Sequence, residues 1–183
     1  MKKIFGLFLL CATMMFSSCS APMLALKSSY PITNSVETET TYDKVWGNVI
    51  DFFAMNNIPI SVLEKDSGII VAPNVSIGET LVTMEDEYGK TINSSAWFIL
   101  PYMNKYNGYK CVSNKAVCSF NVRVRKMDSG KTYISVNLGG IQGTRVLEYV
   151  DMLTFKKSLV DMPAKETCVS TGKFEKDLLN LFK

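Results

Sequence analysis

Apolar and polar residues alternate most clearly over residues 116–127 and again over residues 132–138. An alternation with period two is typical of a β-strand with one buried face and one face in water. Residues 128–131, Asp-Ser-Gly-Lys, have the composition of a turn, so the two stretches are predicted to pair as an antiparallel hairpin. The residues expected to face the core are Ala116, Cys118, Phe120, Val122, Val124, Ile134, Val136 and Leu138.

Two other stretches repeat their apolar residues at three- and four-residue steps, which is the period of an amphipathic helix. The first is predicted to begin at Thr40 or Thr41 and to end at Asn56-Asn57, before Pro59. The second is predicted to be the last element of the chain, with Ser170 or Thr171 as its N-cap. The expected buried faces are Tyr42, Val45, Trp46, Val49, Ile50 and Phe53 in the first helix, and Phe174, Leu178, Leu181 and Phe182 in the second.

The remaining pattern predicts a second hairpin and a less regular middle. Residues 58–64 and 69–72 flank a turn at 66–68 and are predicted to be paired strands, ended by Pro73. Residues 74–95 are ambiguous, and within them residues 79–88 fit either a strand or a short helix. Gly139–Gly143 is expected to be a flexible loop before a strand in 146–155. Because helices and strands group instead of alternating, the predicted fold class is α+β: an antiparallel curved sheet with two helices packed on one face.

The N-terminal residues have a different pattern. Lys2 and Lys3 precede an apolar run from Ile4 to Phe16, and two serines then precede Cys19, as in a bacterial secretory signal that ends in a lipobox. We expect a signal peptide at 1–18, a lipid on the Cys19 sulfur, a tether at 19–39 and a single α+β domain at 40–183. The alternative is an ordinary signal peptide cleaved nearby, with Cys19 incidental. Leu24 and Leu26 of the tether could also lie on the membrane surface.

Composition narrows the range of functions. The chain has 20 Lys+Arg and 17 Asp+Glu, and loss of the signal removes two lysines and no acid, leaving 18 against 17. A net charge near zero gives no case for nucleic acid as a partner. The chain contains no histidine, which removes Ser-His-Asp and Cys-His catalysis and the imidazole-based zinc sites. No catalytic, cofactor-binding or metal-binding residue is therefore predicted.

After lipidation of Cys19, three cysteines remain outside the signal: Cys111, Cys118 and Cys168. Disulfides persist in the oxidising compartment that the signal implies. The favoured pair is Cys111 with Cys168, which closes the longer loop. The alternative is Cys111 with Cys118, across a two-residue turn at Asn114-Lys115.

Residues 97–109 are unusually aromatic, with the sequence WFILPYMNKYNGY. Pro101 and Gly108 argue against one long regular element. Aromatic residues on a loop are common at binding surfaces, because they combine a large contact area with a polar tip. The alternative is a hydrophobic loop folded over the core. If the domain has a binding surface, the residues expected to form it are Trp97, Tyr102, Tyr106 and Tyr109.

Three short strings resemble a known family: Thr-Tyr-Asp-Lys-Val-Trp at 41–46, Ile-Pro-Ile at 58–60, and Lys-Asp-Ser-Gly-Ile-Ile-Val at 65–71. They are similar to the helix-grip type of unit in BamC-like lipoproteins, which accompany the outer-membrane barrel-assembly machine. The resemblance covers residues 40–73, and this chain holds one such domain where BamC has two. Residues 120–124 and 168–172 are similar to segments in lipoproteins of Bacteroides-like bacteria. Similarity to enteric lipoproteins, with Ser20 after the cysteine and no aspartate, implies the outer membrane, facing the periplasm.

Taken together, these features predict a membrane-anchored lipoprotein that acts as a non-catalytic binding or accessory module for another envelope protein. One alternative is a carrier of a lipid or small molecule, which would need a cavity between the first helix and the sheet, beneath Trp46 and Phe53. The other is a hydrolase without histidine, which would need perturbed acids or a Ser-Lys pair converging in a cleft.

Overall fold

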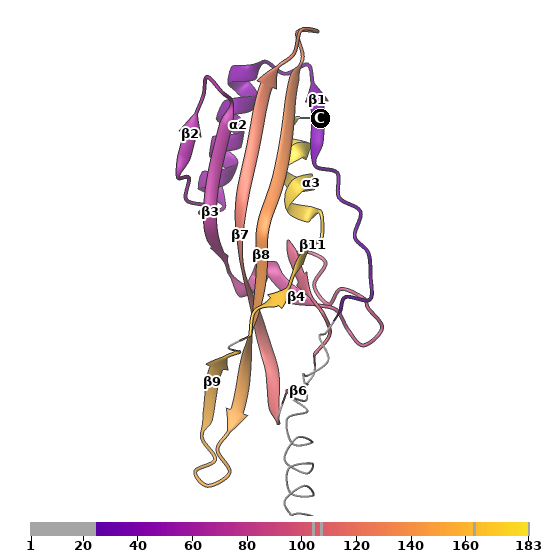
Figure 1. The fold of residues 1–183 in the computed structure, drawn as a ribbon, viewed down its shortest axis with the longest axis vertical. Helices are drawn as coiled ribbons and strands as arrows, with labels where there is room; N and C mark the ends of the chain where they lie inside the picture. Colours follow the sequence, from indigo (N-terminus) through magenta and orange to yellow (C-terminus); the bar gives the residue numbers. More distant parts are fainter. Residues whose placement is uncertain (1–24, 104, 107, 163, 183) are drawn as a thin grey trace, which may run out of the picture.

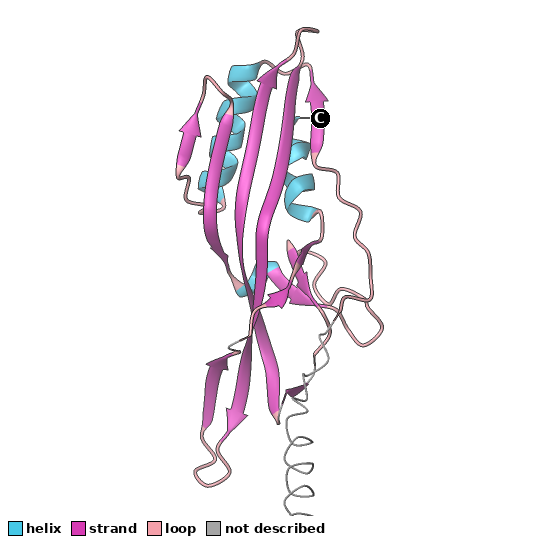
Figure 2. Ribbon diagram, viewed as in Figure 1, coloured by secondary structure: helices cyan, strands magenta, loops and turns pink. Residues whose placement is uncertain are grey.

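A computed structural model describes residues 25–103, 105–106, 108–162 and 164–182. Its main sheet follows the order β1-β8-β7-β3-β2, with three further short strands paired to β7 and β8, and it is antiparallel throughout. A second, three-stranded sheet has the order β11-β5-β4, and its β4–β5 pair is parallel. Two helices, α2 and α3, lie behind the main sheet in Figure 2. The α+β fold class is therefore confirmed.

The centre of the molecule is the long hairpin of β7 (Tyr109–Lys126) and β8 (Thr132–Val150), which runs most of the length of Figure 1. The predicted inward residues of β7 are all buried, so this part of the sequence prediction is confirmed. Gly139–Gly143 is not the flexible loop that was expected, because it continues β8 opposite β7. The register shift between Val117 and Ser119 accommodates one extra residue of β8 as a β-bulge, so the pairing continues through the glycines.

The predicted N-terminal hairpin is present as β2 (Val62–Glu64) and β3 (Ile69–Ile77). The turn between them contains Gly68 at a φ of +67°, where a Cβ would collide with the carbonyl of Val124, so glycine is required there. Pro73 does not end β3, contrary to the expectation. It lies at a register shift between Ala72 and Val75, a position where the sheet tolerates a residue without an N–H group.

The ambiguous middle of the chain forms the small second sheet and the short strands around it. The 3₁₀ turn η2 (Glu79–Leu81) leads into β4 (Val82–Met84), which pairs with β5 (Phe98–Leu100). The other short strands are β6 (Lys105–Tyr106), β9 (Lys157–Asp161), β10 (Glu166–Thr167) and β11 (Val169–Ser170).

Both helices pack on the same face of the main sheet, around an aromatic core. Helix α2 (Tyr42–Met55) buries Val45, Trp46, Val49 and Phe53, as its periodicity predicted. Helix α3 (Lys173–Leu179) is followed by the 3₁₀ turn η3 (Asn180–Phe182). Its N-cap is Gly172, not Ser170 or Thr171, and Leu179 is buried where Leu181 was expected.

The space between α2 and the sheet is filled. The ring of Phe53 lies 6.1 Å from that of Phe120 and 6.5 Å from that of Phe174, and these side chains are fully buried. Burial of such a side chain contributes roughly 1.5–3 kcal/mol. A carrier was expected to have a cavity beneath Trp46 and Phe53, and aromatic packing occupies that place instead.

The expected tether is in part a component of the domain. Residues 35–38 form β1 (Ser35–Thr38), which pairs with β8 from Ser135 to Thr132. The hydroxyl of Thr38 also donates to the carbonyl of Phe182, at 2.8 Å. Structured chain therefore begins well before residue 40, and the domain boundary expected there is too late. Cys19 and the signal segment lie outside the described residues.

Candidate interaction surface

The aromatic segment does not form the exposed surface that was expected. Trp97 is 4% exposed, and its ring packs 4.9 Å from that of Phe174, so it belongs to the core. Tyr102 and Tyr109 are half-buried, and Tyr109 lies 5.2 Å from Tyr149 in a tilted ring pair. Tyr106 lies in β6, paired with Tyr109 through the backbone. Trp97 is thus wrongly assigned, because the strand Phe98–Leu100 draws its neighbours into the core.

A different feature dominates the surface. The lower halves of β7 and β8 leave the helices and continue, with β9, as a projecting ladder (Figure 1). We define the arm as residues 109–115, 144–150 and 157–161, and the tip as the connecting residues 151–156. In Figure 2 the arm lies at one end of the molecule and the turn between β7 and β8 at the other.

The base of the arm is fixed by Arg145, whose side chain is fully buried. Its guanidinium forms a bidentate ion pair with the Glu166 carboxylate, with both N–O distances at 2.7 Å. It also donates to the carbonyl of Pro101 at 2.6 Å. The planar guanidinium suits this bidentate geometry, which a lysine could not reproduce. Arg145 therefore joins β8 to the β10 segment and to the chain that follows β5.

Next to this ion pair lies a small second core of Met103, Cys111, Leu147 and Met162. Cys111 thus belongs to the arm, whereas Cys118 and Cys168 lie in the main core. All three are free thiols, so neither expected disulfide is formed. Because β7 has no turn at Asn114-Lys115, Cys111 and Cys118 are separated along one strand by about 23 Å, far beyond the reach of a disulfide.

The three thiols are expected to be unreactive in the native protein. Burial raises the pKa of Cys118 and of Cys168 to about 12, and it also raises the pKa of Cys111. Since the thiolate is the reactive form, iodoacetamide at pH 8 should leave all three unmodified. In guanidinium without reductant all three should be alkylated, as counted by mass spectrometry. A requirement for reductant at any two of them would contradict the free-thiol state, and an exposed Ser129→Cys variant provides the labelling control.

The tip is an ordered loop that holds its apolar side chains in solvent. The carboxylate of Asp151 accepts the N–H groups of Leu153 and Thr154 at 2.8 and 2.9 Å, which lowers the pKa of Asp151. The backbones of Asp151 and Lys156 close the loop through an N–H to carbonyl bond of 2.9 Å. Met152, Leu153 and Phe155 are 78%, 91% and 78% exposed, although each is a large apolar residue. Three such residues within four positions make the tip a candidate interaction site.

The long edge of the arm is also exposed. All five residues of β9 are exposed, and β9 pairs with β8 and with no other described strand. Leu159 and Val160 add apolar side chains to this edge. Two exposed ion pairs flank it, Lys157 with Glu148 at 3.3 Å and Lys115 with Asp161 at 3.2 Å. An open strand edge is a template for pairing with another chain unless something covers it.

Residues 25–30 are fastened to the domain near the base of the arm. The carboxylate of Glu85 is fully buried and accepts the N–H groups of Lys27 and Ser28, at 2.8 and 2.9 Å. Ser28 bonds in addition to the carbonyl of Gly89. We call this contact the Glu85 clamp. Met84, the residue before it, touches the guanidinium of Arg145, so the clamp and the base of the arm lie side by side.

Replacement of Glu85 with glutamine is expected to loosen this clamp. An amide has one acceptor oxygen in place of two, and its NH₂ group would face a backbone donor. Loss of a buried charge-assisted bond should cost about 1–3 kcal/mol of local protection. Hydrogen exchange at the amides of Lys27 and Ser28 measures the effect. The matched control is Glu87→Gln, because that side chain is exposed; equal exchange in the two variants would contradict the clamp.

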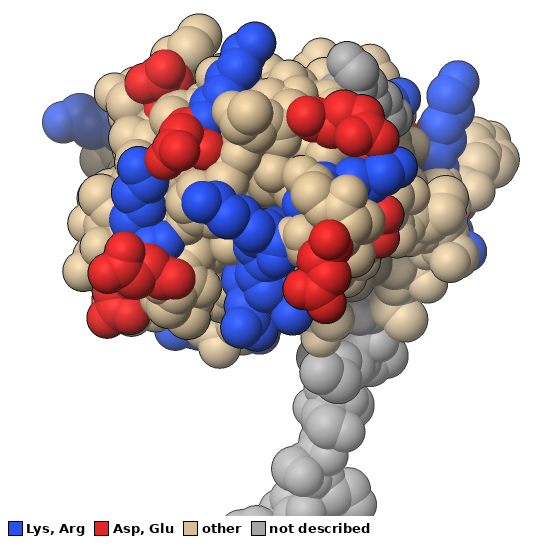
Figure 3. All heavy atoms as spheres, turned by 90° about the horizontal axis from the view of Figure 1, so that it is seen from above, with Lys and Arg blue, Asp and Glu red and all other residues tan. Residues whose placement is uncertain are grey.

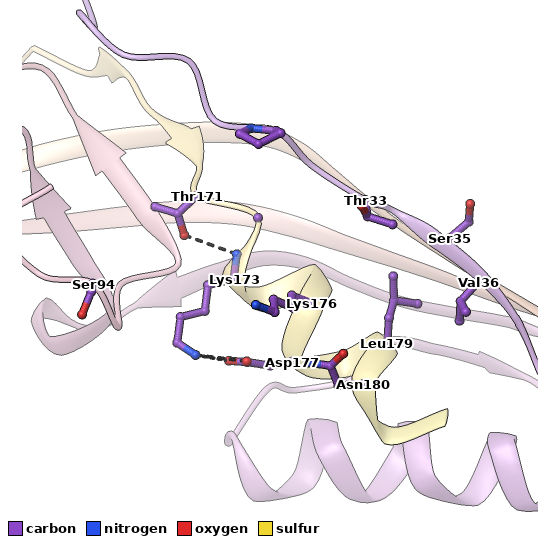
Figure 4. A pocket seen from close by; sticks show the side chains of 12 residues that line it. Thr33, Ser35, Val36, Ser94, Thr171, Lys173, Lys176, Asp177, Leu179 and Asn180 are labelled. Carbon is purple, nitrogen blue, oxygen red and sulfur yellow. Dashed lines mark hydrogen bonds and ion pairs between the residues drawn. The ribbon is translucent and has the colours of Figure 1, made fainter. Parts of the chain in front are cut away.

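Three shallow hollows lined by described residues lie elsewhere on the surface. The first, of about 650 Å³, lies between residues 31–36 and α3, and Figure 4 shows Lys173 and Asp177 paired beside it. The second, of about 670 Å³, lies at the end opposite the arm. Figure 3 shows that Lys and Arg at this end are interspersed with Asp and Glu, so it has no uniform charge. The third, of about 410 Å³, is lined in part by Cys168 and Glu175.

The acids with perturbed pKa values do not converge in any of these hollows. A hydrogen bond from Lys65 lowers the pKa of Asp43, at the start of α2, and burial raises that of Glu175 in α3. Asp151 belongs to the tip, on the far side of the molecule from α2. Among the described residues, no group of three or more potential metal ligands lies together.

Comparison of the chain with protein-family profiles, with curated proteins and with solved structures finds no match. In the part of the chain that the structure describes, no helix is long and apolar enough to cross a bilayer.

Proposed function

We propose that this chain is a lipoprotein anchored at Cys19 to the outer membrane, facing the periplasm, where it serves as a non-catalytic accessory module for another envelope protein. The observation that carries the proposal is the arm, with its open and partly apolar β9 edge. The lipobox before Cys19 supports the anchor and the compartment.

The geometry of the β9 edge favours recognition by strand addition. In that mode a partner strand bonds to the free backbone groups of the edge, and alternate side chains supply specificity. Leu159 is 67% exposed and Val160 is half-exposed, so a partner strand would find apolar side chains on both faces. The ion pairs of Lys157 and Asp161 at the two ends of β9 would limit the register of such pairing.

The resemblance to BamC-like lipoproteins supports an accessory role at the outer membrane. The residues that carry it, 40–73, span α2 and the hairpin of β2 and β3. We propose on this basis that the unit of α2, β2 and β3 is of the helix-grip type. The proposed partner is an envelope protein, and the balance of charges gives no reason to invoke nucleic acid.

Site-specific photocrosslinking in intact native cells tests the proposal. A photoreactive residue at Leu159 should give one discrete crosslinked protein, which mass spectrometry identifies. The matched control is the same residue at Leu63, an exposed position on the edge strand β2. A Cys19→Ser variant should lose the crosslink, because the protein would no longer be held at the membrane.

Three outcomes would refute this function. Equal crosslinking from Leu63 and Leu159 would mean that the β9 edge is not the contact surface. A crosslink that forms only between copies of this chain would replace the accessory role with self-association. A crosslink that persists in the Cys19→Ser variant, with the protein released from the membrane fraction, would remove the anchor from the proposal.

A further inference from the structure

We propose that the tip of the arm inserts into the surface of the lipid bilayer that holds the Cys19 lipid. The proposal rests on the proposed function for the lipid anchor, and it concerns residues 151–156, not the β9 edge. It assigns the arm a second role, which is to set the height and orientation of the domain on the membrane.

The chemistry of the tip suits the boundary between headgroups and acyl chains. Figure 1 shows the loop after β8 at the end of the projecting ladder. Met152, Leu153 and Phe155 are large, apolar and mostly exposed. Lys156 and Lys157 follow them directly, and both are exposed. Proteins that lie on bilayers bury apolar residues at this depth while lysine side chains reach back to the lipid phosphates. A protein pocket could also accept apolar residues, and the test below separates these two outcomes.

The tip is built to hold these residues outward before any contact is made. The Asp151 carboxylate is turned to the N–H groups of Leu153 and Thr154, so its charge is directed into the loop. Phe155 has a φ of +55°, a left-handed conformation that aromatic residues seldom adopt. A bond of 2.8 Å from its N–H to the carbonyl of Asp151 holds it there. The N–H groups of Leu153, Thr154 and Phe155 thus already have acceptors within the loop and need no new partner on insertion.

The chain between the lipid and the clamp is long enough to bring the lipid to the level of the tip. Cys19 and Lys27 are eight positions apart, and a fully extended chain of that length spans at most about 26–29 Å. The clamp lies beside Arg145. The five residues of β8 from there to Val150, where the tip begins, span about 17 Å. A lipid at Cys19 can therefore reach the level of the tip but little beyond it. With the arm toward the bilayer, the tip meets the membrane.

Fluorescence of a single probe tests the position of the tip. The mature lipidated protein, purified from native membranes, is reconstituted into vesicles of phosphatidylethanolamine and phosphatidylglycerol. An environment-sensitive dye is attached at Leu153→Cys, or at Ser129→Cys in the turn at the opposite end, while the buried native thiols stay unlabelled. We expect the dye at position 153 to shift to the blue, to be quenched by spin-labelled lipid and to be shielded from iodide. The dye at position 129 should show none of these changes.

A second variant guards against insertion by the dye alone. Met152→Ser and Phe155→Ser together should return the dye at position 153 to water, whereas Met55→Ser, at an equally exposed apolar residue of α2, should not. Retention of protein on the vesicles reports the anchor separately from the tip. Retained protein with the dye in water would overturn insertion and leave the anchor intact. A dye shielded from iodide but not quenched by lipid would assign the tip to a protein contact, and loss of protein from the vesicles would overturn both proposals.

Discussion

Replacement of Arg145 with methionine is expected to destabilise the protein by about 3–5 kcal/mol. The substitution keeps most of the length of the side chain but removes the partner of Glu166, whose carboxylate is 13% exposed. It also leaves the Pro101 carbonyl without its donor at 2.6 Å. An uncompensated charge is costly at such a site because the carboxylate has lost most of its contact with water. Urea unfolding, followed by circular dichroism, measures the loss as a lower midpoint.

The double variant Arg145→Met with Glu166→Met provides the informative comparison. With both charges removed, much of the lost stability should return, since a buried ion pair contributes little net stability over an apolar pair of similar volume. Lys157→Met is the matched surface control. It breaks an ion pair with Glu148 in the same arm, but that pair is exposed on the lysine side, and it should cost less than about 1 kcal/mol. Similar losses for Arg145→Met and Lys157→Met would show that the buried pair does not hold the arm.

Replacement of Phe174 with alanine is expected to cost about 3–5 kcal/mol. This ring is fully buried and contacts aromatic rings from three other segments: Phe52, Phe53, Trp97 and Phe120, at 4.4–6.5 Å. Its removal would leave a cavity where α3, α2, β7 and the chain before β5 meet. The well-packed neighbours can collapse into that space only in part, so the cost should lie near the upper end for such substitutions.

Phe155→Ala is the control for this prediction, because it makes the same chemical change at a residue that is 78% exposed. It should change the free energy of unfolding by less than about 0.5 kcal/mol. Thermal and urea unfolding of both variants, compared with the parent protein, give the two values. If the two substitutions cost the same, the aromatic cluster would not be the centre of the core.

The periodic parts of the sequence predicted the fold well, because their side chains have one clear choice of environment. The stripe of α2, from Val45 to Phe53, and the alternation from Ala116 to Val124 are both buried as expected. In these elements, local preference and tertiary packing agree. The pattern therefore identified both helices, both hairpins and the α+β class.

The sequence predictions were wrong where pairing between distant strands overrides the local preferences of the residues. Gly139 and Gly143 indicate a loop, yet they lie within β8 and remain paired with β7. Gly143 is also packed against the side chain of Leu100, which a larger residue would displace. Pro73 indicates the end of a strand, yet a bulge accommodates it. A bulge leaves no pattern in a single strand, because it depends on the register with a partner.

The candidate surface was misplaced for a related reason. Trp97 and Tyr102 drew attention as aromatic residues in a loop, but the parallel pairing of β4 with β5 carries that segment into the core. Residues 152–155 were interpreted as the irregular end of a strand. Their composition, with Met, Leu and Phe, does not distinguish an exposed loop from a buried segment. Their exposure follows from the length of the β7–β8 ladder, which is set by pairing and not by any local motif.

The contact between β1 and the C-terminal turn has a consequence for the order in which the chain folds. The bond from Thr38 to Phe182 links residues 144 positions apart, and β1 needs β8 to be in place before it can pair. Contacts of such separation in the chain are slow to form, because loop closure must precede any gain. Under the export and lipidation proposed above, β1 would pair late, and the chain before it would remain accessible to lipid-attaching enzymes until the last residues had been translocated.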